Sequence, residues 1–346
     1  MTLIYFILIL GIVILVHEFG HFIFAKRAGI YVYEFSIGMG PRIFKWTRKN
    51  DETEYSIRLI PIGGFVQMAG EEIEDDKSVP KDKKFSSKTF GQQLITCFAG
   101  IMNNFILAIV LLFIIALFNG APQGKPIVGS ISKDYPAYTS GLQKGDVILK
   151  LDGKNASNTD LLSLELQVHQ GKTINLTVDR DGEEKNIILK PKKTLVDGKE
   201  TYKYGFAIND EVKRGFLPAL EYAFSKFFSL IWQMIMIFVY LFTGHLSFAS
   251  LAGPVGIYGV VGTAAASGLW SLVSLTAYIS INVGFINLIP LPAFDGGRIF
   301  ILLIEKITGK KINPRIENTF HAIGFFLLML LMVLITYNDI IRMISG

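Results

Sequence analysis

Residues 1–27 read MTLIYFILILGIVILVHEFGHFIFAKR, and this stretch decides the fold. Positions 3–25 form an apolar run long enough to cross a bilayer, which needs about 20 helical residues. The run lacks a preceding basic segment and a following small-residue cleavage site, so we expect a retained spanning helix. Ionisable residues inside such a run are costly and are by default functional, which singles out His17, Glu18 and His21.

The spacing of His17 and His21 places both imidazoles on one face of a helix, one turn apart. This H-E-x-x-H arrangement can hold one metal ion, with Glu18 beside it as a candidate base. A hydrolytic zinc ion takes three protein ligands and a water, whose proton a nearby carboxylate accepts. The alternative is a pair of polar residues tucked into a helix bundle, but the cost of burying them favours a metal site.

The composition is that of a membrane protein. The chain has 346 residues, of which 51% are hydrophobic and 18% charged, and 27 are Phe. The net charge of +5 is too small to indicate nucleic acid, because the basic residues gather beside apolar runs, as in cytoplasmic loops. Cys97 is the single cysteine, so disulfides within the chain and Cys-based zinc sites are excluded and metal ligands must be His, Asp or Glu.

Further along the chain, three more apolar runs are long enough to span: 94–118, 270–293 and 320–341. The run 217–243 is ambiguous. Between the second and third spans, residues 122–210 are polar and rich in Gly and Lys, which predicts a small soluble β-rich domain.

That domain has short alternating stretches typical of strands, namely 126-PIVGSI, 146-DVILKLDG and 174-INLTVDR. The piece 158-NTDLLSLELQVHQG predicts one helix, with Asn158 or Thr159 as N-cap and Gly171 past its end. The charged stretch 71–85 predicts an exposed loop.

A third metal ligand is expected far away in sequence, and Asp295 in 287-NLIPLPAFDGG is the candidate. Together with 17-HEFGHF, this motif closely resembles the site-2 protease family, in its bacterial regulator-of-sigma protease (RseP/RasP) branch. The stretches 61-PIGGFVQMAGE, 99-AGIMNNFILA and 252-AGPVGI also look like family landmarks in the right order. The resemblance implies a zinc endopeptidase with His17, His21 and Asp295 as ligands and Glu18 as the catalytic glutamate.

The chain departs from that family at two points. The family often has a Gly-Pro before the Asn of its second helix, whereas this chain reads 100-GIMNN, which leaves open whether Asn103 or Asn104 corresponds. The chain is also shorter than members with two PDZ domains, so we expect a single-PDZ member.

The basic residues of the loops and the number of membrane crossings together predict the topology. His17, His21 and Asp295 must lie at one depth, and the first loop is basic, which places the zinc end of the first helix near the cytoplasm and the soluble domain outside. If 217–243 also crossed, Asp295 would reach the wrong face. We therefore expect four spanning helices, with 217–243 as an amphipathic helix along the outer interface, the alternative being a fifth span.

The segment 55-YSIRLIPIGGFVQMAG alternates and contains adjacent glycines, which favours a β-hairpin at about 53–70. The resemblance implies a re-entrant loop along which substrate lies as an added strand, centred on Gly63, Gly64 and Phe65. The alternative is an ordinary cytoplasmic hairpin.

Before the candidate ligand, Pro290 and Pro292 prevent a regular helix, and irregular backbone at membrane depth is tolerated only against protein or a water-filled cavity. The amides of Asn282 and Asn287 are candidate donors to substrate backbone or to an oxyanion, and Pro290 and Pro292 are candidate substrate contacts in the same segment. A structural hydrogen bond between helices is the alternative.

The stretch 136-PAYTSGLQKGDVILKLDG resembles PDZ domains of bacterial proteases, with Gly141, Leu142, Gly145 and Asp146 at the matching positions. The resemblance implies that this domain excludes substrates until another protease has trimmed them. The remaining histidines, His169, His245 and His321, are not expected to bind the metal.

The resulting prediction is an α-helical polytopic membrane protein with four transmembrane helices, a re-entrant β-hairpin and one small β-rich PDZ-like domain. Four parts are predicted. The membrane part is divided between residues 1–120 and 269–346, the PDZ-like domain covers 122–210, and the interfacial helix and loop cover 217–268. It is expected to reside in the bacterial inner or plasma membrane and to cut transmembrane segments of single-pass proteins, such as anti-sigma factors or signal-peptide remnants. The alternatives are an inactive membrane PDZ scaffold and a metal transporter, and the intact Glu18 argues against the scaffold because structure alone needs no base.

Overall fold

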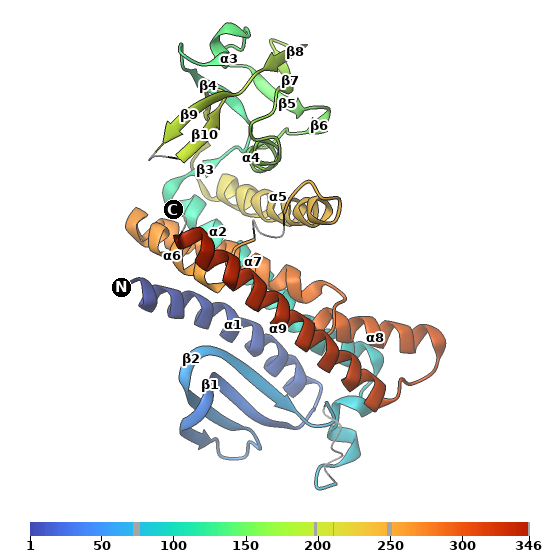
Figure 1. Ribbon diagram of the computed structural model, residues 1–346. Coiled ribbons are helices and arrows are strands. Elements are labelled where there is room, and N and C mark those ends of the chain that lie inside the picture. The colour runs from blue at the N-terminus through green and yellow to red at the C-terminus, as the bar shows by residue number, and fades with distance from the viewer. Residues whose placement is uncertain (72–76, 197–198, 210, 248–250, 345–346) are drawn as a thin grey trace. The chain divides into compact units, whose positions relative to one another are not determined.

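The computed structural model describes residues 1–71, 77–196, 199–209, 211–247 and 251–344 (Figure 1). The chain divides into two units, Met1–Leu111 with Phe248–Gly346, and Leu112–Ser247. Each is described by itself. Five helices of the described chain are long and apolar enough to cross a membrane: α1 (Thr2–Arg27), α2 (Phe90–Asn119), α5 (Phe216–Phe242), α7 (Leu269–Leu288) and α9, within which the apolar stretch is Arg315–Ile344.

The four predicted spans correspond to α1, α2, α7 and α9 (Pro314–Ile344). The fifth candidate, α5, is the run whose role was ambiguous, so the count of four spans stays a prediction. Within the first unit, α1 packs on α6 (Pro254–Ser267) and α7 through an apolar cluster built around Val13. The side chains of α1 are apolar on its buried and its exposed faces, which is typical of a helix enclosed by protein and lipid.

Two α-helices of the first unit were missed. Residues 254–267 form α6 where a loop was predicted, because Pro254 occupies the first turn, where it needs no hydrogen-bond donor. Asp295 does not end the preceding helix but begins a separate one, α8 (Asp295–Thr308), which Gly309 ends in the left-handed conformation. The residues between α7 and α8 are irregular, as the prolines predicted.

The β-hairpin lies beside α1 (Figure 1), but its partner strand was missed. The prediction placed a whole hairpin within 53–70, whereas β2 (Glu54–Met68) is one long strand that pairs with β1 (Val32–Thr47). Both strands bend, so Phe35 pairs with Val66 on one side and with Tyr55 on the other. This pairing leaves segment 64–68 at one edge of the sheet among the described strands.

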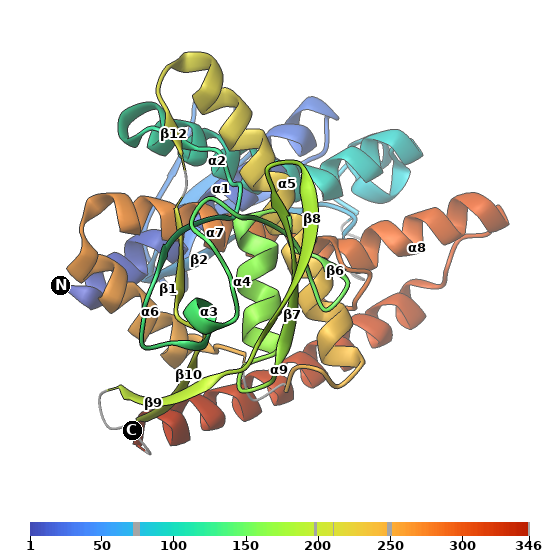
Figure 2. The same cartoon turned by 90° about the horizontal axis from the view of Figure 1, so that it is seen from above.

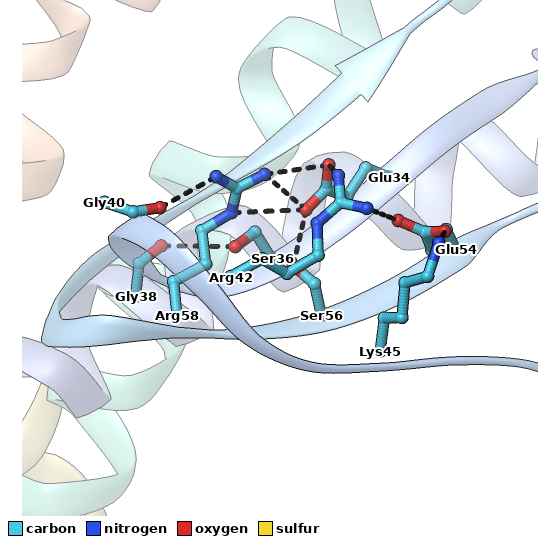
Figure 3. A network of polar contacts seen from close by, with 9 residues as sticks. All are labelled: Glu34, Ser36, Gly38, Gly40, Arg42, Lys45, Glu54, Ser56 and Arg58. Carbon is cyan, nitrogen blue, oxygen red and sulfur yellow. Dashed lines mark hydrogen bonds and ion pairs between the residues drawn. The ribbon is translucent and has the colours of Figure 1, made fainter.

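A buried ion-pair network holds the two strands together at their bend (Figure 3). Glu34 is 5% exposed and accepts hydrogen bonds from Arg58 at 2.7 and 3.0 Å, from Arg42 at 3.0 Å and from Ser56. Burial alone would raise the pKa of the Glu34 carboxyl, but these hydrogen bonds and both guanidinium charges lower it. The network therefore keeps a carboxylate charged inside the sheet and fixes its register.

Of the predicted loop 71–85, residues 72–76 lie outside the described residues. The described remainder contains two short 3-10 helices, η1 (Lys81–Lys83) and η2 (Phe85–Ser87). Lys84 and Phe85 are buried, so the expectation of a wholly exposed loop was wrong there. Phe85 packs into an apolar cluster, which a prediction based only on the charged residues of this segment does not take into account.

The second unit contains the predicted β-rich domain. Its main sheet has the order β11-β4-β5-β7-β8, with β6 beside β5. The three predicted strand stretches are β4 (Ile127–Ile131), β5 (Val147–Leu151) and β7 (Ile174–Arg180). The remaining strands are β3 (Ala121–Pro122), β6 (Lys154–Asn155), β8 (Glu183–Leu189), β9 (Lys192–Val196), β10 (Lys199–Lys203), β11 (Phe206–Asn209) and β12 (Val212–Lys213).

The predicted helix of this domain is α4 (Thr159–Val168), which packs over the sheet (Figure 2); the short helix α3 (Pro136–Thr139) precedes β5. Asn158 is the N-cap of α4 and accepts a hydrogen bond from the Leu161 N–H at 2.8 Å. Gly171 lies just past the end of α4 and has φ +77°. Both details agree with the sequence-based prediction.

Candidate metal centre

Three side chains from distant parts of the sequence converge at one point in the first unit. His17 and His21, one turn apart on α1, have their Nε2 atoms 3.2 Å apart. The Oδ2 atom of Asp295, at the start of α8, lies 3.0 Å from His17 Nε2 and 3.3 Å from His21 Nε2. Among the described residues, this is the one group of three such side chains placed to hold a metal ion.

The donor atoms fit a tetrahedral zinc ion. Ligands bonded at about 2.0–2.1 Å in a tetrahedral site lie about 3.3 Å from one another, close to the three observed separations. Both histidines are buried, and Asp295 Oδ2 is a buried atom without a hydrogen-bond partner in the described part of the chain. Three lone pairs pointing at one another repel, so this arrangement is stabilised by a cation between them.

Each imidazole is oriented by a contact on its other nitrogen. His21 Nδ1 lies 2.8 Å from the Thr96 carbonyl oxygen, to which it must donate, so its Nε2 carries a free lone pair. His17 Nδ1 lies 3.2 Å from the side-chain amide of Asn104, which is fully buried. A half-turn of that amide places its carbonyl oxygen, a buried atom without another partner among the described residues, on the Nδ1–H of His17.

These contacts resolve which asparagine of α2 faces the site. Asn104 contacts His17, whereas Asn103 donates to the carbonyl of Val16 at 3.2 Å. The Asn104 backbone carbonyl also accepts a hydrogen bond from Ser280 on α7 at 2.8 Å. Asn104 on α2 therefore links His17 on α1 to Ser280 on α7.

Two glycines let α1 and α2 approach closely. A methyl group on Gly100 would lie 2.8 Å from Nε2 of His17 and closer still to Nε2 of His21. A methyl group on Gly20 would lie 2.7 Å from the carbonyl carbon of Ala99. Glycine is therefore required at both positions by space.

The loop that presents Asp295 is held from the far side by α9. Ala293 has φ +71°, an unusual conformation for a residue with a side chain, and its N–H donates to His321 Nδ1 at 3.0 Å. Gly324 leaves room for Pro292, whose Cα would lie 3.0 Å from a methyl group there. His321 thus positions the loop without touching the three donor atoms, in line with the prediction that it is not a ligand.

One turn after Asp295, Arg298 ties α8 to the end of the hairpin. Its guanidinium forms an ion pair with Glu71 and lies 4.4 Å from the centre of the Phe85 ring. Neither Arg298 nor Glu71 was predicted from the sequence as a site residue. Their proximity follows from the way β2 and α8 pack, and neither has a local pattern that reveals it.

Glu18 is half-buried beside the two histidines, and β2 passes close to it. A methyl group on Gly64 would lie 3.6 Å from Glu18 Cγ. Gly63 is buried next to it with φ +96°, and Phe65 follows with its ring 4.9 Å from the Arg58 guanidinium. Three of the residues predicted to contact substrate, Gly63, Gly64 and Phe65, therefore belong to a strand that passes beside the candidate base.

The two predicted amide donors are engaged with their own helix. Asn282 donates to the Tyr278 carbonyl at 2.8 Å and Asn287 to the Val283 carbonyl at 2.9 Å. Pro290 and Pro292 lie in the irregular segment after α7. A role in binding substrate stays a prediction for all four.

In the β-rich domain, Gly141, Leu142, Gly145 and Asp146 form the turn before β5. Asp146 accepts from Arg180 at 2.6 and 2.7 Å and from the Gln143 N–H at 2.9 Å. Burial alone would raise the pKa of its carboxyl, but these hydrogen bonds lower it. The four residues thus have a structural part in this turn, and the PDZ-like identity of the domain stays a prediction.

Comparison with known proteins shows the family to which this chain belongs. The model of peptidase family M50 matches residues 5–331. A protein of Staphylococcus aureus is 34% identical, covering 99% of this chain and 98% of that protein. The zinc metalloprotease RasP of Oceanobacillus iheyensis is 32% identical, with 99% of this chain and 99% of that protein covered. RasP of Geobacillus kaustophilus is 30% identical, with 98% of this chain and 97% of that protein covered.

The alignment with the Staphylococcus aureus protein spans 424 positions, more than the 346 residues of this chain, so that relative carries insertions. The family match extends over both membrane parts and the β-rich domain between them. The apolar helices and the family together identify a multi-pass membrane protein that depends on zinc. The chain belongs to peptidase family M50, the site-2 protease family of intramembrane zinc metalloproteases.

Proposed function

We propose that this protease cuts peptide bonds within the transmembrane segments of single-pass membrane proteins, with His17, His21 and Asp295 holding the zinc ion and Glu18 acting as the base. The observation that carries this assignment is the convergence of three buried donor atoms within 3.3 Å of one another, on helices with apolar surroundings. A transporter would need further ligand groups along its path, and the described residues contain one such group.

When bound, zinc lowers the pKa of a water and polarises the carbonyl to be attacked. The protein supplies the remaining parts. Glu18 accepts the proton of the attacking water and delivers it to the departing amine, while the Thr96 carbonyl and Asn104 keep both imidazoles in the ligand tautomer. Gly100 keeps α2 from occupying the space of the ion.

The edge of β2 is the proposed binding surface for substrate. A transmembrane helix must unwind before its amides can react, and an unwound segment needs partners for its backbone. The free edge at Gly64–Gln67 offers such partners beside Glu18. Gly63, Gly64 and Phe65 are the proposed contacts.

The hairpin is proposed to enter the membrane, in preference to a cytoplasmic position. The Pro61 carbonyl oxygen lies 3.3 Å from the point where a methyl group on Gly11 would be. Gly11 precedes His17 by six residues, about 9 Å along the helix, so β2 extends beyond the metal site toward the middle of α1. Apolar side chains are exposed at this end of the hairpin, including Ile43, Phe44 and Leu59 at 58–63%.

We further propose that α5 lies along the outer membrane surface. Its Lys226 and Ser229 contact the Asp160 carboxylate of α4, and Tyr240 donates to Glu165. These contacts extend over 14 residues, about 21 Å of helix. A helix held against a polar domain over that length has too little remaining to cross a hydrocarbon core of about 30 Å.

This topology predicts which sites an impermeant maleimide can reach from outside intact cells. Arg214→Cys and His245→Cys, which flank α5, should both be labelled from outside. Native Cys97 is 4% exposed and gives little background. Lys311→Cys is the control for the opposite side and should react only after permeabilisation. Labelling of His245→Cys only after permeabilisation would mean that α5 spans.

The β-rich domain is proposed to be a PDZ-like domain on the outer side, with the zinc site near the cytoplasmic side of a bacterial plasma membrane. Basic residues at the zinc end of α1, such as Lys26 and Arg27, support this orientation. In this arrangement the domain would exclude substrates until another protease has trimmed their outer part. Single-pass proteins are therefore the proposed partners.

Removal and return of the metal tests the proposed function. The protein, purified and reconstituted in vesicles, should cleave a single-span substrate whose N-terminus faces the zinc side. A chelator should abolish cleavage and zinc should restore it, because the water is activated only on the metal. Mass spectrometry should locate the cut within the span. Cleavage that survives complete loss of zinc, or lies only outside the span, would contradict the proposal.

A further inference from the structure

A cavity of about 330 Å³ lies between the start of α2 and the end of α8, away from the metal centre. Both elements belong to the first unit. The cavity is notable for the number of cations around it. Its lining includes Lys88, Phe90, Leu302, Lys306, Lys310 and Lys311.

The charges of this cavity do not cancel. Four lysines face one carboxylate, that of Glu305, which forms an ion pair with Lys311 at 3.0 Å and accepts from the Ile312 N–H at 2.7 Å. Lys88 donates to the Gly29 carbonyl at 2.9 Å and has no carboxylate within 4 Å among the residues that the structure describes. Lys310 is exposed, with no acidic group of the described chain within 4 Å. The cavity is therefore suited to an anion.

The position of the cavity is that of lipid headgroups. Phe90 on its wall is the first residue of α2, a helix apolar enough to span, so the cavity lies where that helix enters the bilayer. Lys306 lies over the same ring, 5.8 Å from its centre. Cations beside the end of a spanning helix meet the phosphates of the nearest leaflet.

An apolar stripe on α8 runs directly beside these cations. Phe300, Leu303 and Ile307 are 45%, 41% and 83% exposed and share one face at helical spacing. No described element covers this stripe, and Lys306 and Lys310 border it. A free phosphate ion uses only the cations, whereas a phospholipid uses the cations and the apolar stripe together.

We propose that this cavity binds the headgroup of an anionic glycerophospholipid, with its phosphate at Lys306 and Lys310 and an acyl chain along Phe300, Leu303 and Ile307. The shared chemistry is a phosphate anion, and the stripe assigns it to a lipid. The site lies at the far end of α8 from Asp295. Binding of lipid there does not require zinc, so the proposal stands independently of the proposed catalytic roles.

Lipid retention by the purified full-length protein tests this site. The protein is exchanged into mixed micelles with phosphatidylglycerol or phosphatidylcholine, and bound lipid is counted by native mass spectrometry. The unmodified protein should retain phosphatidylglycerol preferentially. Lys306→Gln/Lys310→Gln should lower that affinity about 30-fold, since each lysine near an anionic headgroup contributes about fivefold. Lys45→Gln/Lys49→Gln removes the same charge from exposed positions of the hairpin and should leave retention unchanged.

Three results would overturn the proposal. Equal retention of the two lipids by the unmodified protein would remove the preference for anions. An equal loss in the Lys45/Lys49 control would reduce the effect to general surface charge. Displacement of phosphatidylglycerol by millimolar inorganic phosphate would assign the cavity to a free ion in place of a lipid.

Discussion

The Glu18→Gln variant is expected to retain its zinc and to lose cleavage of a single-span substrate by about a thousandfold or more. The amide has nearly the shape of the carboxylate but cannot accept the proton of the attacking water, a step that contributes about 10²–10⁴ to such reactions. The metal stays because its three proposed ligands, His17, His21 and Asp295, are unchanged. Metal content by atomic emission and initial cleavage rates in vesicles measure the two effects separately.

His21→Ala provides the contrast, because it removes a proposed ligand and should lose zinc and activity together. Glu221→Gln, on the exposed surface of α5, is the matched control for loss of one carboxylate and should behave like the unmodified protein. A fully active Glu18→Gln protein would eliminate the proposed role of this residue. Full zinc content in His21→Ala would do the same for the ligand assignment.

Gly100→Ala is expected to lower zinc affinity by at least about 100-fold, a large effect for one methyl group. The added carbon would lie within 2.8 Å of His17 Nε2 and closer to His21 Nε2, so either α2 moves away or the imidazoles turn from the metal. Both responses separate the donors that converge at Asp295. The zinc affinity, measured by titration against a competing chelator, and the cleavage rate should fall in parallel.

Gly91→Ala is the control for this prediction, because it makes the same change on the same helix. A methyl group there would meet nothing within 4 Å, so zinc affinity and activity should stay as they are. The midpoint of thermal unfolding should not fall, since alanine favours a helix over glycine. Equal behaviour of Gly100→Ala and Gly91→Ala would show that α2 does not limit the space of the metal.

Local patterns in the sequence predicted much of this protein. The apolar run with His17 and His21 at helical spacing indicated both a spanning helix and a ligand pair, because each depends only on residues within one or two turns. In the β-rich domain, the strands β4, β5 and β7 followed from alternation and the helix α4 from its capping residues, and Asn158 caps α4 as expected. Asp295 was identified through the resemblance of its motif, not through spacing.

The missed strand β1 and the open choice between Asn103 and Asn104 share one physical cause, which is dependence on tertiary packing. β1 was missed because a strand is defined by its partner, and β2 lies some 20 residues away along the chain. The choice between Asn103 and Asn104 stayed open because it depends on how α2 is rotated against α1. No local pattern reports that rotation.

By itself, the sequence placed His17, Glu18 and His21 at helical spacing within an apolar segment, because residue type and helical period are local properties. The tertiary structure alone decided that His17, His21 and Asp295 meet within 3.3 Å, that Gly100 leaves the space between them, and that the Thr96 carbonyl orients His21. These are contacts between segments from about 75 to 280 residues apart, and only the packing of helices brings such segments together.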